Sequence, residues 1–121
     1  MSSTRQQRMA SLVKEELSRI IREEMNDPRL GFISITEVDI SADLHTAHVY
    51  VSIYGAEKEQ QDTMTALESA RRFLRGQLGK AVEMRYTPEL VFHQDTSIER
   101  GARIFELLHE IEKSDKGASH E

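Results

Sequence analysis

The segment AHVYVSIY, residues 47–54, alternates apolar and more polar side chains, and this pattern constrains the fold more than any other feature. Ala47, Val49, Val51 and Ile53 fall on one face of a strand, because successive side chains of a strand point to opposite faces. A strand with one apolar face needs burial on that face alone. We therefore expect helices to pack on one face of a sheet and to build the core there.

The preceding segment, FISITEVDI over residues 32–40, is rich in β-branched residues and predicts a partner strand. Its apolar positions change phase between Ile35 and Val38, which predicts a β-bulge near Thr36. SADLH, between the two segments, is typical of a hairpin loop.

Helical spacing of apolar residues predicts a helix on each side of these strands. A first helix over about residues 5–25 has its stripe at Met9, Leu12, Val13, Leu17, Ile20 and Ile21. After a polar loop that begins with GAEKEQQD, a second long helix has its stripe at Met64, Leu67, Ala70, Leu74, Leu78 and Val82. Each glycine inside a helix costs about 1 kcal/mol relative to alanine. We expect the second helix to be weakened or kinked near Gly76 to Gly79.

Pro88 excludes helix just before it, and ELVFHQ predicts a short third strand. Thr96 and Glu99 have capping-box spacing and predict the start of a last helix, with Asp95 and Ser97 as alternative caps. Its apolar stripe is Ile104, Leu107, Leu108 and Ile111. The order is helix, strand, strand, broken helix, strand, helix, which is an α+β fold. We expect one domain over residues 1–113 and a flexible polar tail over 114–121.

Length and composition narrow the class of protein. The 121 residues suit one domain, and the absence of cysteine excludes disulfides, thiolate metal sites and a cysteine nucleophile. No apolar run approaches the roughly 20 residues of a membrane helix, and the start carries no signal-peptide pattern. We expect a cytoplasmic protein without a membrane segment.

Charge is distributed unevenly along the chain. The net charge is -5, yet RRFLRGQLGK, residues 71–80, holds four cations, two glycines and no acid. Residues 70–93 have five basic and two acidic side chains, whereas 36–69 have one basic and seven acidic ones. A local basic surface of this kind is typical of nucleic-acid binding, although charges also solvate any exposed helix.

On a helix, positions 72, 75, 76 and 79 share the face opposite the apolar stripe. Small residues there let a sugar-phosphate backbone approach, and guanidinium groups donate to phosphate oxygens. Gly76-Gln77-Leu78-Gly79 also has the GxxG spacing of the KH loop that clamps nucleotides. The alternative is that both glycines are packing positions beside Leu78, and we favour it.

Catalytic and metal-binding patterns are weak. GQLGKA lacks the spacing and the hydroxyl of a phosphate-binding loop. His45 and His48 point to opposite faces, and His93 on the third strand is better explained as structural. Glu57, Glu59 and Asp62 are explained by solvation of a loop. We expect no enzymatic activity, no metal site and no cofactor.

Three segments together resemble the bacterial ribosome-binding factor A family. They are DPRLGFISITEVDISADLHTAHVYVSIYG, FLRGQLGKAVEMRYTPELVF and DTSIERGARI, and the likeness runs over roughly residues 5–112. Each segment is moderately specific, and their order and spacing are highly specific.

The resemblance implies a type II KH-like fold, with a three-stranded sheet and helices on one face. It implies a cytoplasmic, monomeric, non-catalytic factor that binds the free small (30S) ribosomal subunit. Such a factor assists late assembly and 16S rRNA processing through the 5'-terminal helix region of that RNA, most of all in the cold.

One departure concerns the second helix. The family usually has an Ala-x-Gly kink, and the matching positions here are Ala70, Arg71 and Arg72. Either the helix runs on to Gly76 or tertiary packing bends it at the family position. Because arginine is a good helix former, we favour a straight helix at Arg72.

The predicted RNA-binding residues are those of the basic segment: Arg71, Arg72, Arg75, Gly76, Gly79, Lys80 and Arg85. Arg5, Arg8, Arg100 and Arg103 form a secondary set. The alternative hypothesis is a protein-protein adaptor that docks its acidic face, residues 36–69, on a basic partner.

Overall fold

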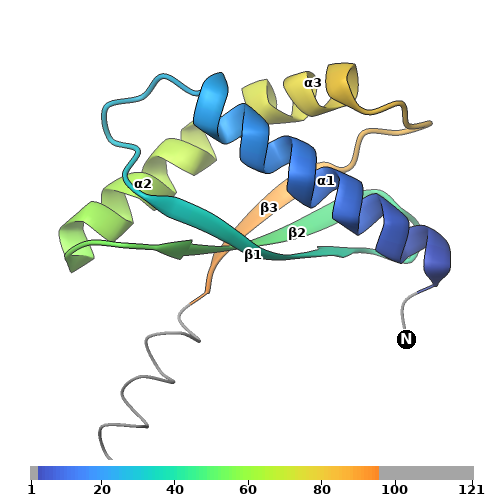
Figure 1. Ribbon diagram of the computed structural model, residues 1–121, viewed down its shortest axis with the longest axis horizontal. Coiled ribbons are helices and arrows are strands. Elements are labelled where there is room, and N and C mark those ends of the chain that lie inside the picture. The colour runs from blue at the N-terminus through green and yellow to red at the C-terminus, as the bar shows by residue number, and fades with distance from the viewer. Residues whose placement is uncertain (1–2, 96–121) are drawn as a thin grey trace, which may run out of the picture.

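A computed structural model of the chain describes residues 3–95 (Figure 1). Its elements are α1 (Thr4–Glu23), β1 (Ile33–Ile40), β2 (Thr46–Ile53), α2 (Glu57–Ser69), α3 (Arg71–Ala81) and β3 (Glu89–Gln94). This order confirms the predicted α+β arrangement as far as β3. The predicted last helix and the tail from residue 114 lie outside the described residues.

The three strands form one mixed sheet in the order β1-β2-β3. β1 and β2 are an antiparallel hairpin, and β3 returns parallel to β2, with Val49 opposite Phe92. The register between β1 and β2 shifts between Ile35 and Glu37, so the predicted bulge at Thr36 is confirmed. The bulge keeps Ile35 and Val38 on the same, buried face.

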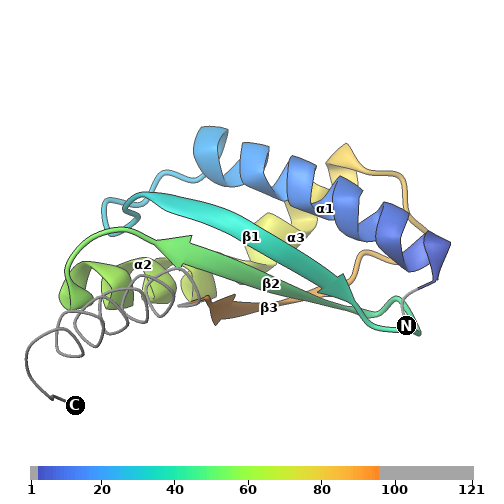
Figure 2. The same ribbon diagram turned by 60° about the horizontal axis from the view of Figure 1, so that its bottom comes forward.

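The core lies between one face of the sheet and the three helices, as predicted. Figure 2 shows the strands side by side, with α1 above β1 and α3 behind the strands. The predicted face of β2 is fully or almost fully buried, and so are the helical stripes around Leu17, Leu67, Leu74 and Leu78. Hydrophobic burial on this one face is therefore the main source of stability.

The start of α1 is fixed by a capping box. The Ser3 hydroxyl accepts from the Gln6 backbone N–H at 3.1 Å, and the Gln6 side-chain oxygen accepts from the Ser3 N–H at 2.9 Å. These bonds satisfy donors that a helix start leaves without partners.

Side chains of α1 also contact the outermost strand. The Gln6 side-chain amide donates to the Ile40 carbonyl at 2.9 Å, and Lys14 Nζ donates to the Thr36 carbonyl at 3.4 Å. β1 has a neighbouring strand on one side only. Two of its carbonyls therefore find partners on a helix instead of on another strand.

The second long helix is interrupted at Ala70, where φ is -90° and ψ is 2°. α2 ends one residue before this point and α3 begins one residue after it, so the expectation of a straight helix at Arg72 is wrong. The kink expected near Gly76 to Gly79 is not found there either, because α3 runs as a helix through both glycines.

Packing explains the position of the break. Ala70 is half-buried against the core, and it lies between Leu67 and Leu74, which are both fully buried. A change of helix direction at Ala70 lets both leucines reach the same core. Little hydrogen bonding is lost, because Ala70 N–H donates to Ala66 O at 3.0 Å and Leu74 N–H donates to Ala70 O at 2.8 Å.

The loop before α2 is shorter than predicted, because part of the polar segment is helical. Gly55 turns the chain with φ of 121°, and the helix begins at Glu57. Glu59 accepts from the Ala56 N–H at 2.9 Å and caps the helix. Acidic residues in a first turn are favoured by the helix dipole, so Glu57 and Glu59 are helix-start residues and not loop residues.

Within residues 3–95, no helix is both long and apolar enough to cross a membrane.

Candidate nucleic-acid interface

The exposed face of α3 is the one predicted from helical spacing. Arg72, Arg75, Gly76, Gly79 and Lys80 are exposed, whereas the leucines of the same helix are buried. The face is therefore available to a ligand along its whole length.

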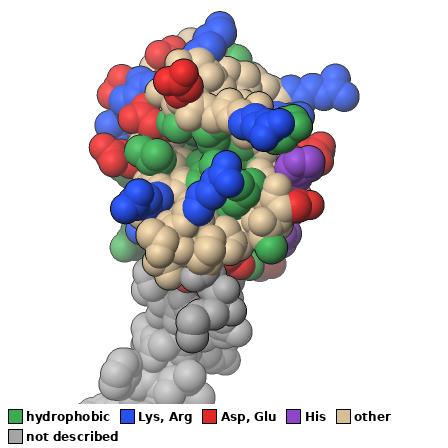
Figure 3. Space-filling model, turned by 90° about the vertical axis from the view of Figure 1, so that its right-hand side faces the viewer, with side chains coloured by type: hydrophobic (Ala, Val, Ile, Leu, Met, Phe, Trp, Pro, Cys, Tyr) green, Lys and Arg blue, Asp and Glu red, His purple; other side chains and the backbone are tan. Residues whose placement is uncertain are grey.

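Helices α1 and α3 run antiparallel, which brings two predicted sets of cations together. The first turns of α1, with Arg5 and Arg8, lie at the same end of the molecule as the last turn of α3 and the loop after it (Figure 1). We call this region the basic end and define it by Arg5, Arg8, Arg75, Lys80 and Arg85. Figure 3 views the molecule from this side and shows Lys and Arg side chains around hydrophobic ones.

Two predicted residues lie away from this end. Arg71 and Arg72 are in the first turn of α3. At 1.5 Å per residue, Arg72 is about 12 Å along the helix from Lys80. The basic surface is thus a strip along α3 that widens at the basic end.

Cations on this strip differ in their partners. Arg75 donates from Nε and Nη2 to the Thr87 carbonyl, at 3.1 and 2.9 Å, and so holds the loop between α3 and β3. Arg71 forms an exposed ion pair with Glu68 at 3.5 Å. Within the described part of the chain, no ion pair is found for Arg5, Arg8, Arg72, Lys80 or Arg85.

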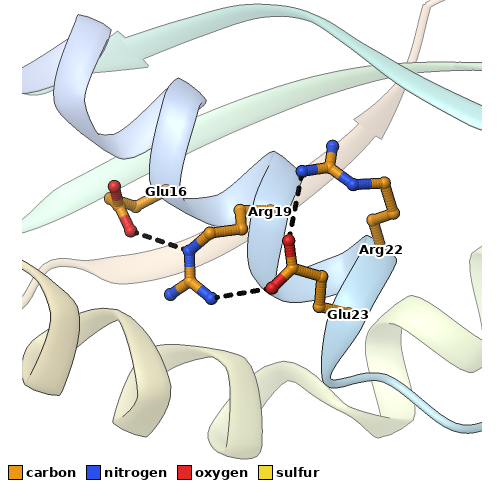
Figure 4. Close-up of polar contacts among 4 residues, drawn as sticks. All are labelled: Glu16, Arg19, Arg22 and Glu23. Carbon is orange, nitrogen blue, oxygen red and sulfur yellow. Dashed lines mark hydrogen bonds and ion pairs between the residues drawn. The ribbon is translucent and has the colours of Figure 1, made fainter.

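The cations at the other end of α1 are neutralised locally. Arg19 contacts Glu16 at 3.1 Å and Glu23 at 3.4 Å, and Arg22 contacts Glu23 at 3.4 Å (Figure 4). The hydrogen bond to Glu16 is the main cause that raises the pKa of Arg19 above its ordinary value. Guanidinium groups held in this way offer less to a phosphate.

A separate pair follows α1. Arg29 Nη2 lies 2.7 Å from Asp27 Oδ2, and the Arg29 backbone N–H donates to the same carboxylate at 2.9 Å. These bonds, the side-chain one first, lower the pKa of Asp27 to about 2. Together with Glu16, Arg19, Arg22 and Glu23, this pair defines what we call the paired end.

The two glycines of α3 have different surroundings. A Cβ at Gly79 would lie 2.8 Å from Thr87 Oγ1, whereas a Cβ at Gly76 would meet nothing within 4 Å. Both lie inside a helix, so the tetrapeptide does not form the KH nucleotide-clamping loop. The favoured packing interpretation is correct for Gly79 and wrong for Gly76.

An exposed aromatic residue, Tyr86, belongs to this region and is absent from the residues predicted above. It is 56% exposed, its ring centroid is 4.9 Å from that of His45, and the Arg85 guanidinium lies 5.8 Å from its centroid. A tyrosine directly after an arginine in the loop before β3 was the sequence signal available for it.

Two further histidines of residues 3–95, His48 and His93, lie on the sheet face opposite the helices. His48 Nδ1 is 2.9 Å from His93 Nε2, and the His93 ring stacks on Tyr50 at 4.9 Å. These contacts agree with a structural role for His93. Among residues 3–95, no group of three potential metal ligands is close enough to hold an ion.

The acidic residues of 36–69 do not form a single face. Glu37 and Asp39 lie on β1, Asp43 lies in the hairpin loop, and the others follow the exposed side of α2. The Ser41 hydroxyl and the His45 N–H donate to Asp43 and lower its pKa. The adaptor hypothesis therefore lacks the one acidic surface that it requires.

These features define a class: a type II KH-like domain whose α3 carries a basic strip and holds the GxxG tetrapeptide inside the helix. The model of the family described as ribosome-binding factor A matches residues 5–108. The chain belongs to the ribosome-binding factor A family.

Relatives and solved structures agree. The chain is 51% identical over 115 residues to ribosome-binding factor A of Heliobacterium modesticaldum, covering 95% of each chain. It is similar to the crystal structure of ribosome-binding factor A from Thermus thermophilus, with a TM-score of 0.66, 29% identity, and 74% of this chain and 94% of that one covered.

A second Thermus thermophilus structure is a homology model of the same factor, fitted into a cryo-EM map of its complex with the 30S subunit. The TM-score is 0.61 at 30% identity, with 72% of this chain and 91% of that chain covered. Of the predicted secondary residues, Arg100 and Arg103 lie outside the described residues.

Proposed function

We propose that this protein binds the free 30S ribosomal subunit through 16S rRNA and acts as an assembly factor without catalysis. The observation that carries the proposal is the set of exposed cations without ion pairs on α3 and at the start of α1, within residues 3–95. Family membership and the Thermus complex support the choice of ligand.

Electrostatics favours RNA as the contacted component. Ribosomal RNA is a dense surface of phosphates, and cations that lack protein partners gain most from contact with it. The remainder of the chain is mostly acidic, so the protein approaches with the basic strip first and is repelled in other orientations.

The finer features of the proposal come from the family resemblance. They are a role late in subunit assembly and in 16S rRNA processing, contact with the 5'-terminal helix region, and action as a cytoplasmic monomer needed most in the cold. The proposed contact surface is the strip on α3, with Arg71, Arg72, Arg75, Gly76, Gly79 and Lys80, together with Arg85 in the loop after that helix.

The test is binding to purified 30S subunits over a series of salt concentrations. Arg8→Gln with Lys80→Gln removes one cation without an ion pair from each helix of the basic end. Affinity should fall, and the slope of log affinity against log salt should flatten by roughly 0.7 to 0.9 for each phosphate that the variant no longer binds.

Arg22→Gln with Lys58→Gln is the matched control. It removes two exposed cations from the other end of the molecule and changes the net charge equally. Its salt slope should equal that of the unmodified protein. Equal slopes for all three proteins would contradict the proposed surface, and no binding by the unmodified protein would contradict the function.

A further inference from the structure

Tyr86 stands out among the exposed aromatic residues because of what surrounds it. It lies in the loop between α3 and β3. The exposed Phe32 precedes β1 and the exposed Tyr54 follows β2, so both lie at the end of the hairpin that is far from its loop. Its ring contacts that of His45 with a tilt of 58°, and this contact holds the ring in place across the hairpin loop. Nothing in the core accounts for the ring, because Tyr86 is not part of the buried cluster.

The loop that carries Tyr86 is held firmly. Arg75 donates two hydrogen bonds to the Thr87 carbonyl, Pro88 is fully buried, and the Glu89 N–H donates to the His45 carbonyl at 2.8 Å. An aromatic ring on such a loop is presented to solvent with little conformational freedom, which lowers the entropic cost of binding.

The chemistry around the ring is that of a platform for a nucleobase. Aromatic rings and guanidinium planes are the two protein groups on which unstacked RNA bases pack. Tyr86 and Arg85 offer one of each, 5.8 Å apart, and their loop follows the last turn of α3, which carries the exposed Lys80 that can hold a phosphate. Bases inside a duplex are already stacked on their neighbours, so such a platform gains only from an unpaired base.

We propose that Tyr86, with Arg85, is a stacking site for an unpaired nucleobase of RNA. The inference rests on the proposed function and adds that the rRNA at the basic end is single-stranded. The basic strip then supplies affinity through phosphates, and Tyr86 selects single strands over duplex.

Tyr86→Leu tests the site, because it keeps apolar bulk and removes the ring. Affinity for purified 30S subunits should fall roughly 5- to 150-fold, the effect of losing one stacked base. The salt slope should not change, since the same phosphates stay bound. Tyr54→Leu removes an exposed aromatic residue from the opposite end and should bind like the unmodified protein.

A second readout uses the absence of tryptophan from the chain. In Tyr86→Trp, the single indole should be quenched by an adenosine oligonucleotide of about ten residues and not by an adenosine-uridine duplex of the same length. Tyr54→Trp should respond to neither.

The outcomes separate the two proposals. If Tyr86→Leu binds subunits like the unmodified protein, or if duplex quenches the introduced indole as strongly as the single strand does, the stacking site is wrong while the subunit-binding function stands. If the unmodified protein does not bind subunits, both are wrong. Weaker binding with an unchanged salt slope, together with quenching by the single strand alone, supports the site.

Discussion

The two ends of α1 carry the same kind of residue in opposite states. At the basic end, Arg5 and Arg8 are exposed and have no ion pair among residues 3–95. At the paired end, Arg19 and Arg22 are held by Glu16 and Glu23 within the same helix (Figure 4). Arginine content is similar at both ends, so the number of arginines alone does not distinguish them.

The difference shows that a nucleic-acid surface depends on the partners of its cations. An exposed ion pair contributes little to stability, but it neutralises a guanidinium that would otherwise attract phosphate. The acids three and four residues from Arg19 therefore matter as much to function as the arginine itself. Four predictions test this comparison, beginning with the largest effect.

Both ends of α1 are held in place by the hydrophobic core, and Val51→Asp should unfold that core. Val51 is fully buried in the middle strand, and a buried carboxylate without a partner should lower the free energy of unfolding by more than about 4 kcal/mol. Thermal melting followed by circular dichroism measures the effect. Ser52→Asp, one residue further and on the opposite sheet face, should melt near the unmodified protein. Equal melting of both variants would refute the face assignment.

The second prediction adds an acid beside the arginines of the basic end and removes one from the arginines of the paired end. Arg5→Glu should create an acid near Arg8 and weaken binding to 30S subunits by about tenfold or more at low salt, because attraction is replaced by repulsion. Glu16→Gln should do the reverse and increase affinity slightly by releasing Arg19. Sedimentation binding assays compare them. Equal affinities would show that ion pairing does not distinguish the ends.

A third, smaller effect concerns the glycines on the exposed face of α3. Gly76→Ala should raise the free energy of unfolding by up to about 1 kcal/mol, because alanine favours helix and the added Cβ meets nothing. Gly79→Ala should lack this gain, since its Cβ would lie 2.8 Å from Thr87 Oγ1 and force that side chain to move. Urea denaturation measures both, and identical changes would contradict the packing role of Gly79.

The smallest effect is a pH dependence at the paired end. The hydrogen bonds from Arg29 lower the pKa of Asp27 from 3.8 to about 2 in the folded protein. The stabilisation is therefore present above about pH 4 and is lost as pH falls toward 2. Asp27→Asn should remove this part of the acid sensitivity in unfolding curves. An NMR titration of Asp27 with an ordinary pKa would contradict the prediction.

The sequence predicts the elements of this fold because each has a regular apolar period. The bulge at Thr36 was also predictable, since the phase change between Ile35 and Val38 has no other simple explanation. The break at Ala70 was not. Alanine and arginine favour helix, glycine does not, and local propensity therefore pointed to Gly76 and Gly79 instead.

The candidate site was predictable in part. Helical spacing identifies which face of α3 is exposed, because the leucines must be buried. It does not reveal that Arg75 bonds to Thr87, twelve residues away, or that antiparallel packing brings Arg8 toward the end of α3. Those facts depend on tertiary contacts. The proposed role of Tyr86 also depends on its position in the folded protein, beside His45 and Arg85.

Gln6 links the cap of α1 to the edge of the sheet. One side-chain amide closes the cap of α1 with its oxygen and occupies the end of β1 with its nitrogen. When the first turn of α1 unwinds, the Ile40 carbonyl at the edge of the sheet loses its partner in the same step, and unpaired carbonyls at an edge invite pairing with another chain. Protection of this sheet edge against pairing with another chain thus depends in part on the cap of α1, formed by Ser3 and Gln6.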